Sequence, residues 1–166
     1  DVFASGTGGE IRAWENTERI ALESQALDWD VCEVLLPVRE EIAEEEERAV
    51  LRDETADKMR RIRAARELAF RSRCAAGTTI DIGRLRVGPV QILHMPGELF
   101  IEYQLAAGQM APDSNVCVAA YGEYGPGYIG TAEAYFQGGY EVGLHTSRVS
   151  PKADCVLMSA MRELLQ

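Results

Sequence analysis

The chain has 166 residues, of which 46% are hydrophobic and 27% charged, enough to build one domain around a hydrophobic core. Its formal net charge of −10 argues against non-specific binding to nucleic acid, because such binding depends on Lys and Arg neutralising phosphates. No apolar run approaches the roughly 20 residues of a membrane-spanning helix. We therefore expect neither a nucleic-acid partner nor a transmembrane segment.

The first part of the sequence predicts little regular structure. It begins with Asp1 and a short apolar run before the Gly-rich loop at residues 5–9, which is typical of a strand end inside a domain. We therefore expect the sequence to be an incomplete part of a larger domain. Residues 16–27 are predicted to form a helix and residues 31–38, rich in Val and Leu, a short strand.

The four cysteines are too widely spaced in the sequence for the close pairs of a zinc ribbon or a redox dithiol. Cys117 and Cys155 lie in apolar runs, and we expect them to be buried free thiols. Their disulfide state stays open at this stage.

Residues 39–73 are almost all helix formers and predict a charged helical insertion, divided in two at residues 53–55. Its second half has an apolar set at helical spacing: Met59, Ile62, Ala65 and Ala69. It also carries six arginines: Arg60, Arg61, Arg63, Arg66, Arg71 and Arg73. They could form a phosphate or RNA patch, or the basic face of a hairpin whose acidic and basic faces offset each other. Only one aromatic residue, Phe70, lies among these arginines, which favours the hairpin.

The second half of the chain alternates between strand and helix patterns. Strands are predicted at residues 79–82, 84–87, 90–95 and 115–120, with Gly83 as a turn and the third strand central. Helices are predicted at residues 98–110, at residues 132–136, and from the cap Ser150-Pro151 onward. This order favours an α/β fold with a layered mixed sheet and flanking helices.

Polar side chains follow two of these strands, where open α/β sheets place their ligands. Pro96-Gly97 forces a sharp turn, after which Glu98 is expected in the first turn of a helix. There it could serve chemistry or simply favour the positive end of the helix dipole. The loop at residues 121–131 carries Tyr121, Tyr124 and Tyr128, which could form a pocket wall or a packed surface turn.

Together the Pro-Gly-Glu turn and the sequence Tyr128-Ile129-Gly130-Thr131 resemble the neutral (non-lysosomal) ceramidase family, in particular its shorter bacterial ceramidase-like hydrolases. The resemblance runs from about Leu85 to Pro151, with Gly130 in place of a family threonine. It implies that Glu98 and Tyr128 bind a catalytic zinc ion. It also implies that this chain is the carboxy-terminal portion of one ceramidase-like catalytic domain.

The residue types suit that chemistry, because a catalytic zinc takes N and O ligands and keeps one position for water. The resemblance implies two further histidine ligands, both upstream of the Pro-Gly-Glu turn. His94 lies within an apolar strand, where we expect it to pack in the core or support a ligand rather than bind zinc. His145 follows the tyrosine segment, where the family has no zinc histidine, so both histidine ligands are expected outside this sequence.

At the amino-terminal end, Gly9-Glu10-Ile11-Arg12-Ala13 resembles the family stretch Gly-Asp-Val-Ser-Pro, which carries an active-site serine. Arg12 stands at the position of that serine, which favours an anionic or polar substrate over ceramide. We expect Arg12, Tyr121 and Tyr124 to contact the substrate. The loop at residues 5–9 could instead cradle a phosphate, but no Lys-Ser/Thr pair follows it.

Two functions remain open from the sequence. The first is zinc-dependent hydrolysis of an N-acyl amide bond in a small-molecule or lipid-like substrate, with Zn²⁺ as cofactor. The second is a catalytically inactive binding or sensor domain that keeps the fold, which Arg12 favours. The sequence leaves oligomeric state and compartment open, and the resemblance implies a secreted or periplasmic location as one option.

Overall fold

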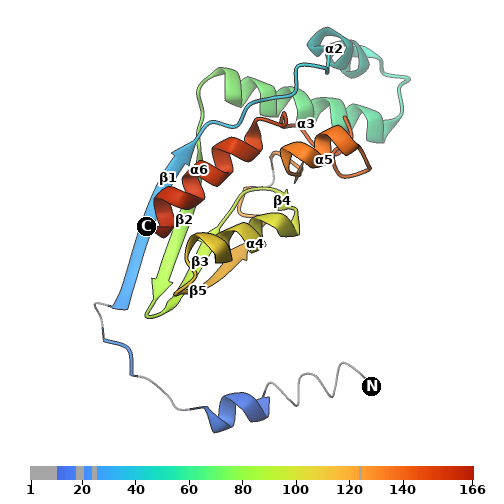
Figure 1. Cartoon of the computed structure of the whole chain (residues 1–166). Coiled ribbons are helices and arrows are strands. Elements are labelled where there is room, and N and C mark those ends of the chain that lie inside the picture. The colour runs from blue at the N-terminus through green and yellow to red at the C-terminus, as the bar shows by residue number, and fades with distance from the viewer. Residues whose placement is uncertain (1–10, 18–20, 24–25, 124) are drawn as a thin grey trace.

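A computed structural model describes residues 11–17, 21–23, 26–123 and 125–166. Its fold is α/β, with a mixed four-stranded sheet and a separate two-stranded one (Figure 1). The larger sheet has the strand order β1-β2-β3-β5, in which β1, β2 and β3 are antiparallel neighbours and β5 pairs with β3 in parallel. Its strands are β1 (Leu27–Val34), β2 (Ile80–Val87), β3 (Val90–His94) and β5 (Asn115–Ala119). The smaller sheet joins β4 (Glu98–Leu99) to β6 (Tyr128–Ile129) in parallel.

Two helices, α4 and α6, pack on one face of the larger sheet (Figure 1). That interface holds the core, where Ile82, Leu93, Tyr103, Leu157 and Met161 are fully buried. The named helices are α2 (Glu44–Arg52), α3 (Lys58–Ala75), α4 (Ile101–Met110), α5 (Ala132–Gln137) and α6 (Ala153–Leu165). None of the helices among the described residues is both long and apolar enough to cross a membrane. The predicted layered arrangement of a mixed sheet with flanking helices is confirmed.

The opposite face of the sheet carries exposed apolar side chains. Side chains alternate along a strand, so Leu27, Trp29 and Val31 of β1 share this face and are 57%, 55% and 47% exposed. The Trp29 ring lies over Gly83, where an added Cβ would be 2.3 Å from Trp29 Cη2. Gly83 therefore lies inside the continuous strand β2, and its prediction as a turn is wrong because the missing side chain makes room for the indole.

The charged segment predicted at residues 39–73 forms a helical hairpin of α2 and α3, divided after Arg52, but its first helix begins at Glu44 and residues 39–43 are not helical. Asp57 caps α3 by accepting a hydrogen bond from the backbone N–H of Arg60 at 3.0 Å. The buried side of α3 differs from the predicted apolar set: Ala64, Glu67 and Phe70 are buried, whereas Met59 is 54% exposed. Contact with the rest of the fold, rather than hydropathy along the helix, decides which side is covered.

Other sequence predictions need correction. The helix expected at residues 16–27 is instead at residues 11–16, residues 21–23 are irregular, and β1 begins at Leu27 rather than Val31. Cys117 and Cys155 are free thiols as expected, but both are exposed. The Ser150 hydroxyl does not cap α6, which begins at Ala153; the Ser150 carbonyl accepts the Ala153 N–H at 3.0 Å.

Candidate functional site

The turn that follows β3 is held by three backbone hydrogen bonds to distant segments. Gly97 donates to the Glu123 carbonyl at 2.8 Å and accepts from the Tyr121 N–H at 2.8 Å. Glu98 donates to the Gly127 carbonyl at 2.9 Å. Gly97 has φ +65°, and a Cβ there would lie 2.6 Å from the Gly127 oxygen. Only glycine supplies both that backbone conformation and that close approach.

Glu98 is not in a helix, as the sequence predicted, but in the two-residue strand β4, and α4 begins at Ile101. Its partner in the parallel ladder is Tyr128 of β6. After the proline–glycine turn, Glu98 adopts a strand conformation. Its backbone N–H donates to the carbonyl of Gly127 and takes no part in the hydrogen bonds of α4. The helix-dipole explanation for Glu98 therefore does not apply.

In-register partners of a ladder project their side chains to the same side of the sheet. Glu98 and Tyr128 are both half-buried, and both line an open concavity of about 420 Å³. The concavity is completed by Leu99, Phe100, Ile101, Glu102 and Glu141. The Tyr128 ring also packs edge-to-face on Tyr140, with 6.1 Å between ring centroids. The structure thus brings together the two residues that the sequence singled out as metal ligands.

The loop before β6 is tightly built. Tyr121 is the one non-glycine residue with positive φ, +67°, among the described residues, and its side chain is 57% exposed. A side chain in this region is strained and persists where surrounding contacts hold it, here the bond to Gly97. A Cβ at Gly122 would lie 2.7 Å from His94 Cε1. His94 is exposed rather than packed in the core, because it lies on the uncovered face of the sheet.

Gly130, which stands where the ceramidase motif that the sequence resembles has a threonine, is buried under Val142. A Cβ at this position would be 2.7 Å from Val142 Cγ1 and 3.3 Å from the Ala134 Cβ. The Gly130 carbonyl accepts a hydrogen bond from the Tyr103 hydroxyl at 3.1 Å, and burial raises the pKa of that phenol well above its usual range. Thr131 caps α5 by accepting the Ala134 N–H at 3.2 Å. Gly130 and Thr131 therefore both have structural roles, in close packing and in helix capping.

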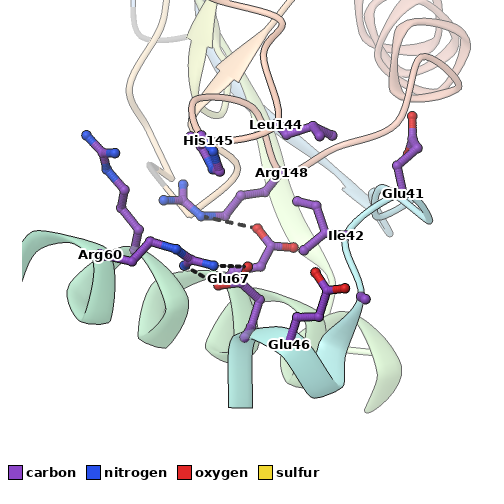
Figure 2. A pocket seen from close by; sticks show the side chains of 11 residues that line it. Glu41, Ile42, Glu46, Arg60, Glu67, Leu144, His145 and Arg148 are labelled. Carbon is purple, nitrogen blue, oxygen red and sulfur yellow. Dashed lines mark hydrogen bonds and ion pairs between the residues drawn. The ribbon is translucent and has the colours of Figure 1, made fainter. Parts of the chain in front are cut away.

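Arg148 connects the loop before β6 to the helical hairpin, a role the sequence did not reveal. It donates to the Gly125 carbonyl at 3.1 Å. It also lies 3.9 Å from a carboxylate oxygen of Glu67 on α3 (Figure 2). Glu67 also accepts from Arg71 at 2.7 Å. Burial nevertheless raises the pKa of Glu67, because desolvation outweighs both arginines. The sequence around Arg148 contains no pattern that predicts its contacts with the loop before β6 and with α3.

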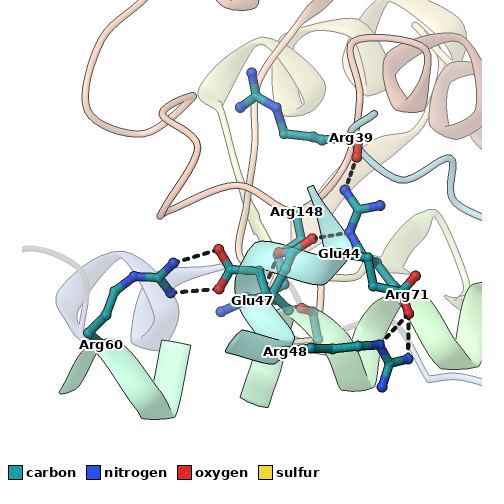
Figure 3. Close-up of polar contacts among 9 residues, drawn as sticks. Arg39, Glu44, Glu47, Arg48, Arg60, Arg71 and Arg148 are labelled. Atoms are coloured by element: carbon teal, nitrogen blue, oxygen red, sulfur yellow. Dashed lines mark hydrogen bonds and ion pairs between the residues drawn. The ribbon is translucent and has the colours of Figure 1, made fainter. Parts of the chain in front are cut away.

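A second carboxylate on the hairpin behaves differently. Glu47 of α2 receives two hydrogen bonds from Arg60, at 2.6 and 2.7 Å (Figure 3). These bonds lower the pKa of Glu47, the opposite direction from Glu67. Arg60 pairs with Glu47 across the hairpin, whereas Arg71 pairs with Glu67 within α3 and Arg73 pairs with Glu123 of the loop before β6.

The remaining predicted site residues either lie apart from the Glu98–Tyr128 ladder or fall outside the residues that the structure describes. Arg12 is exposed within the short helix at residues 11–16. Gly9, Glu10 and Tyr124 lie outside the described residues. His145 is exposed in the loop before Arg148. Within the described part of the chain, no group of three or more His, Cys, Asp or Glu side chains is arranged to hold a metal ion.

No family model matches the sequence, and no curated protein matches it. Two solved structures are similar to part of the chain. One is a ceramidase complexed with C2, 19% identical, with a TM-score of 0.46 over 53% of this chain and 14% of that one. The other is the neutral ceramidase from Pseudomonas aeruginosa, 21% identical, with a TM-score of 0.45 over 53% of this chain and 15% of that one. The match thus spans a small part of either ceramidase, and it establishes no shared chemistry.

Proposed function

We propose that this chain contributes Glu98 and Tyr128 to the zinc site of an enzyme that hydrolyses an N-acyl amide bond. The observation that carries the proposal is their direct pairing in the β4–β6 ladder, on the rim of one concavity. They lie 30 positions apart in the sequence (128 − 98), and the tertiary fold alone makes them neighbours. The motif resemblance singled out the same two residues.

The donor set suits a shared zinc site. A carboxylate and a phenol are oxygen donors, and Glu98 would supply charge while Tyr128 would be a weaker ligand. When bound, zinc would supply Lewis acidity and lower the pKa of a water molecule. The histidines that the resemblance implies would come from sequence outside these 166 residues. The backbone bonds of Gly97 and Glu98 would hold the carboxylate in place, which a metal ligand requires.

The exposed apolar face of the sheet supports the proposal of a larger domain. Leu27, Trp29 and Val31 form a neighbouring set of apolar side chains on one strand, all about half exposed. Contiguous apolar patches of this kind are usually covered by further protein. Chain packed against this face would also approach His94 at the end of β3.

The proposal is tested on the full-length protein that contains this sequence. Zinc content, measured by elemental mass spectrometry, and the rate of N-acyl amide hydrolysis are compared for wild type, Glu98→Gln and Glu102→Gln. Glu102 is the matched control, since its carboxylate lines the same concavity without pairing with Tyr128. Glu98→Gln should lose zinc and activity together, and Glu102→Gln should keep both. Unchanged zinc and rate in Glu98→Gln would show that the proposal is wrong.

A second pair of variants examines the phenol. Tyr128→Phe should reduce turnover more than zinc content, as expected of a weak ligand. Tyr140→Phe is the control, because its ring packs on Tyr128 outside the ladder. A wild-type protein that holds no zinc and hydrolyses no amide would instead support the inactive binding or sensor domain.

A further inference from the structure

A groove of about 470 Å³ lies between α3 and the segment from Gly127 to Arg148. Tyr128 lines this groove as well as the concavity that contains Glu98, so the two hollows meet at that residue. The α3 wall is formed by Met59, Ile62, Arg63 and Arg66, whose spacing places them on one side of the helix. The groove therefore extends the candidate site toward the helical hairpin.

The charge of this groove is opposite to that of the chain. Arg63, Arg66, Arg148 and His145 line it, and the described residues of its lining include no Asp or Glu. The chain as a whole has a formal net charge of −10. A local basic lining in an acidic protein attracts anions to that place.

Two of these arginines have no carboxylate partner among the described residues. Arg63 and Arg66 form no ion pair with any described residue. Four glutamates line the adjoining cavity with Arg63: three are paired with other arginines, whereas Glu46 forms no ion pair with a described residue. Glu47 is held by Arg60 and Glu67 by Arg71. Figure 2 shows the adjoining cavity, in which Arg148 reaches from the loop to Glu67 while His145 lies beside it.

Apolar surface accompanies these charges. Met59 is 54% exposed, Leu144 is 44% exposed, and Ile62 and Tyr140 line the same hollow. A small inorganic anion would use the arginines but leave this apolar lining in water. An amphipathic ligand with a negatively charged group uses both.

We propose that this groove binds the carboxylate of an acyl compound, through Arg63 and Arg66, with the acyl chain against Met59 and Leu144. The inference rests on the proposed function for its link to hydrolysis, since Tyr128 would place the amide beside Glu98. It assigns the preference for anionic substrates, which the sequence attached to Arg12, to two residues of α3. The arginines of the hairpin thus divide into those that hold the fold and those that face a ligand.

The test measures binding to the 166-residue chain by isothermal titration calorimetry. The probes are N-lauroylglycine, its uncharged methyl ester and laurate. Wild type should bind N-lauroylglycine about tenfold more tightly than the ester, as expected for a carboxylate gaining charged hydrogen bonds. This preference should shrink as salt is raised, because these exposed charges are screened. Laurate is the second anionic probe. If N-lauroylglycine binds more tightly than laurate, the groove recognises a carboxylate on a headgroup; if laurate binds more tightly, it recognises the carboxylate of a free fatty acid.

The variants assign the preference to residues. Arg63→Gln/Arg66→Gln should bind acid and ester equally. Arg48→Gln/Arg52→Gln removes the same charge from α2, outside the groove, and should keep the preference, as should Arg12→Gln. Equal binding of acid and ester by wild type would overturn the inference, and so would a preference lost in Arg12→Gln or kept in Arg63→Gln/Arg66→Gln. If wild type binds the acid selectively but the full-length protein hydrolyses no amide, the inference about the groove is supported and the proposed function is wrong. If the full-length protein hydrolyses amides but wild type binds acid and ester equally, the proposed function is supported and the inference about the groove is wrong.

Discussion

Glu98 and Tyr128 face each other as in-register partners of a two-residue parallel ladder. Neither strand could persist alone at this length, so the pair depends on the hydrogen bonds that fix its ends. On one side Gly97 is bonded to Glu123 and Tyr121, and on the other Tyr128 donates to the Thr146 carbonyl at 3.1 Å. The positions of the two candidate ligands thus depend on hydrogen bonds among three segments: the turn at Gly97, residues 121–127 and the loop at Thr146.

A prediction about Gly97 follows from this construction. Gly97→Ala should destabilise the fold by about 2–4 kcal/mol, since it combines left-handed strain with a clash against the Gly127 oxygen. Two control glycines separate these causes. Gly77→Ala, with φ +74° and open space, should cost about 1 kcal/mol, whereas Gly108→Ala in α4 should stabilise by about 0.5–1 kcal/mol. Urea unfolding of the three variants gives the order, and a Gly97→Ala cost no larger than that of Gly77→Ala would refute the close approach.

Gly130 offers a test of close packing in the segment that resembles the ceramidase motif. Gly130→Thr, which introduces the threonine of the motif that this segment resembles, should destabilise by about 1–3 kcal/mol because the added side chain meets Val142. Val142→Ala would remove that obstacle. The double variant should therefore be more stable than the sum of the two single changes predicts, which a double-mutant cycle measures. Strict additivity would mean that Val142 does not limit this position.

The sequence could predict the elements but not the local structure at Glu98. The strands around residues 90–94 and 115–119 and the helices near residues 44–75 and 132–137 were predictable because hydropathy and helix propensity are local signals. Glu98 was expected in a helix, because Leu99, Tyr103, Ala106 and Met110 recur at helical spacing after it. Its strand geometry comes from residues near position 128, and no local pattern carries that information.

The candidate site shows the same division. Motif resemblance pointed to Glu98 and Tyr128, and the fold brings them together. Arg63 and Arg66 could not be separated from the neighbouring arginines, since all six share one charge and one helix. Only the positions of Glu47, Glu67 and Glu123 show which arginines are paired. Burial of α3 was mispredicted for a related reason: a paired Glu67 can be covered, while Met59 faces the groove.

Zinc binding by the isolated chain should be weak. Glu98 and Tyr128 are two oxygen donors, and a zinc site of four ligands is not completed by two. After dialysis, the purified 166-residue chain should retain far less than one equivalent of zinc, and Glu98→Gln should leave that amount unchanged. Stoichiometric zinc that survives dialysis and disappears in Glu98→Gln would show that this chain completes the site without further ligands.

The two buried glutamates of the hairpin should respond oppositely to pH. Arg60 lowers the pKa of Glu47 in the folded state, so its contribution to stability is complete above the unfolded pKa of about 4.3. That contribution is lost as pH falls below this value through the lowered folded pKa. Glu47→Gln should therefore cost about 2 kcal/mol at pH 7 and much less at pH 3.

For Glu67 the sign reverses, because burial raises its folded pKa and the fold favours the protonated form. Ionisation of Glu67 then opposes folding as pH rises through the unfolded and folded pKa values. Glu67→Gln, which keeps the size and removes the charge, should be better tolerated at pH 7 than Glu47→Gln. Urea unfolding of both variants at pH 3, 5 and 7 measures this. If Glu67→Gln were the more damaging at pH 7 and the milder at pH 3, Arg71 and Arg148 would outweigh the burial of Glu67, and the hairpin would be held to the loop before β6 by charge.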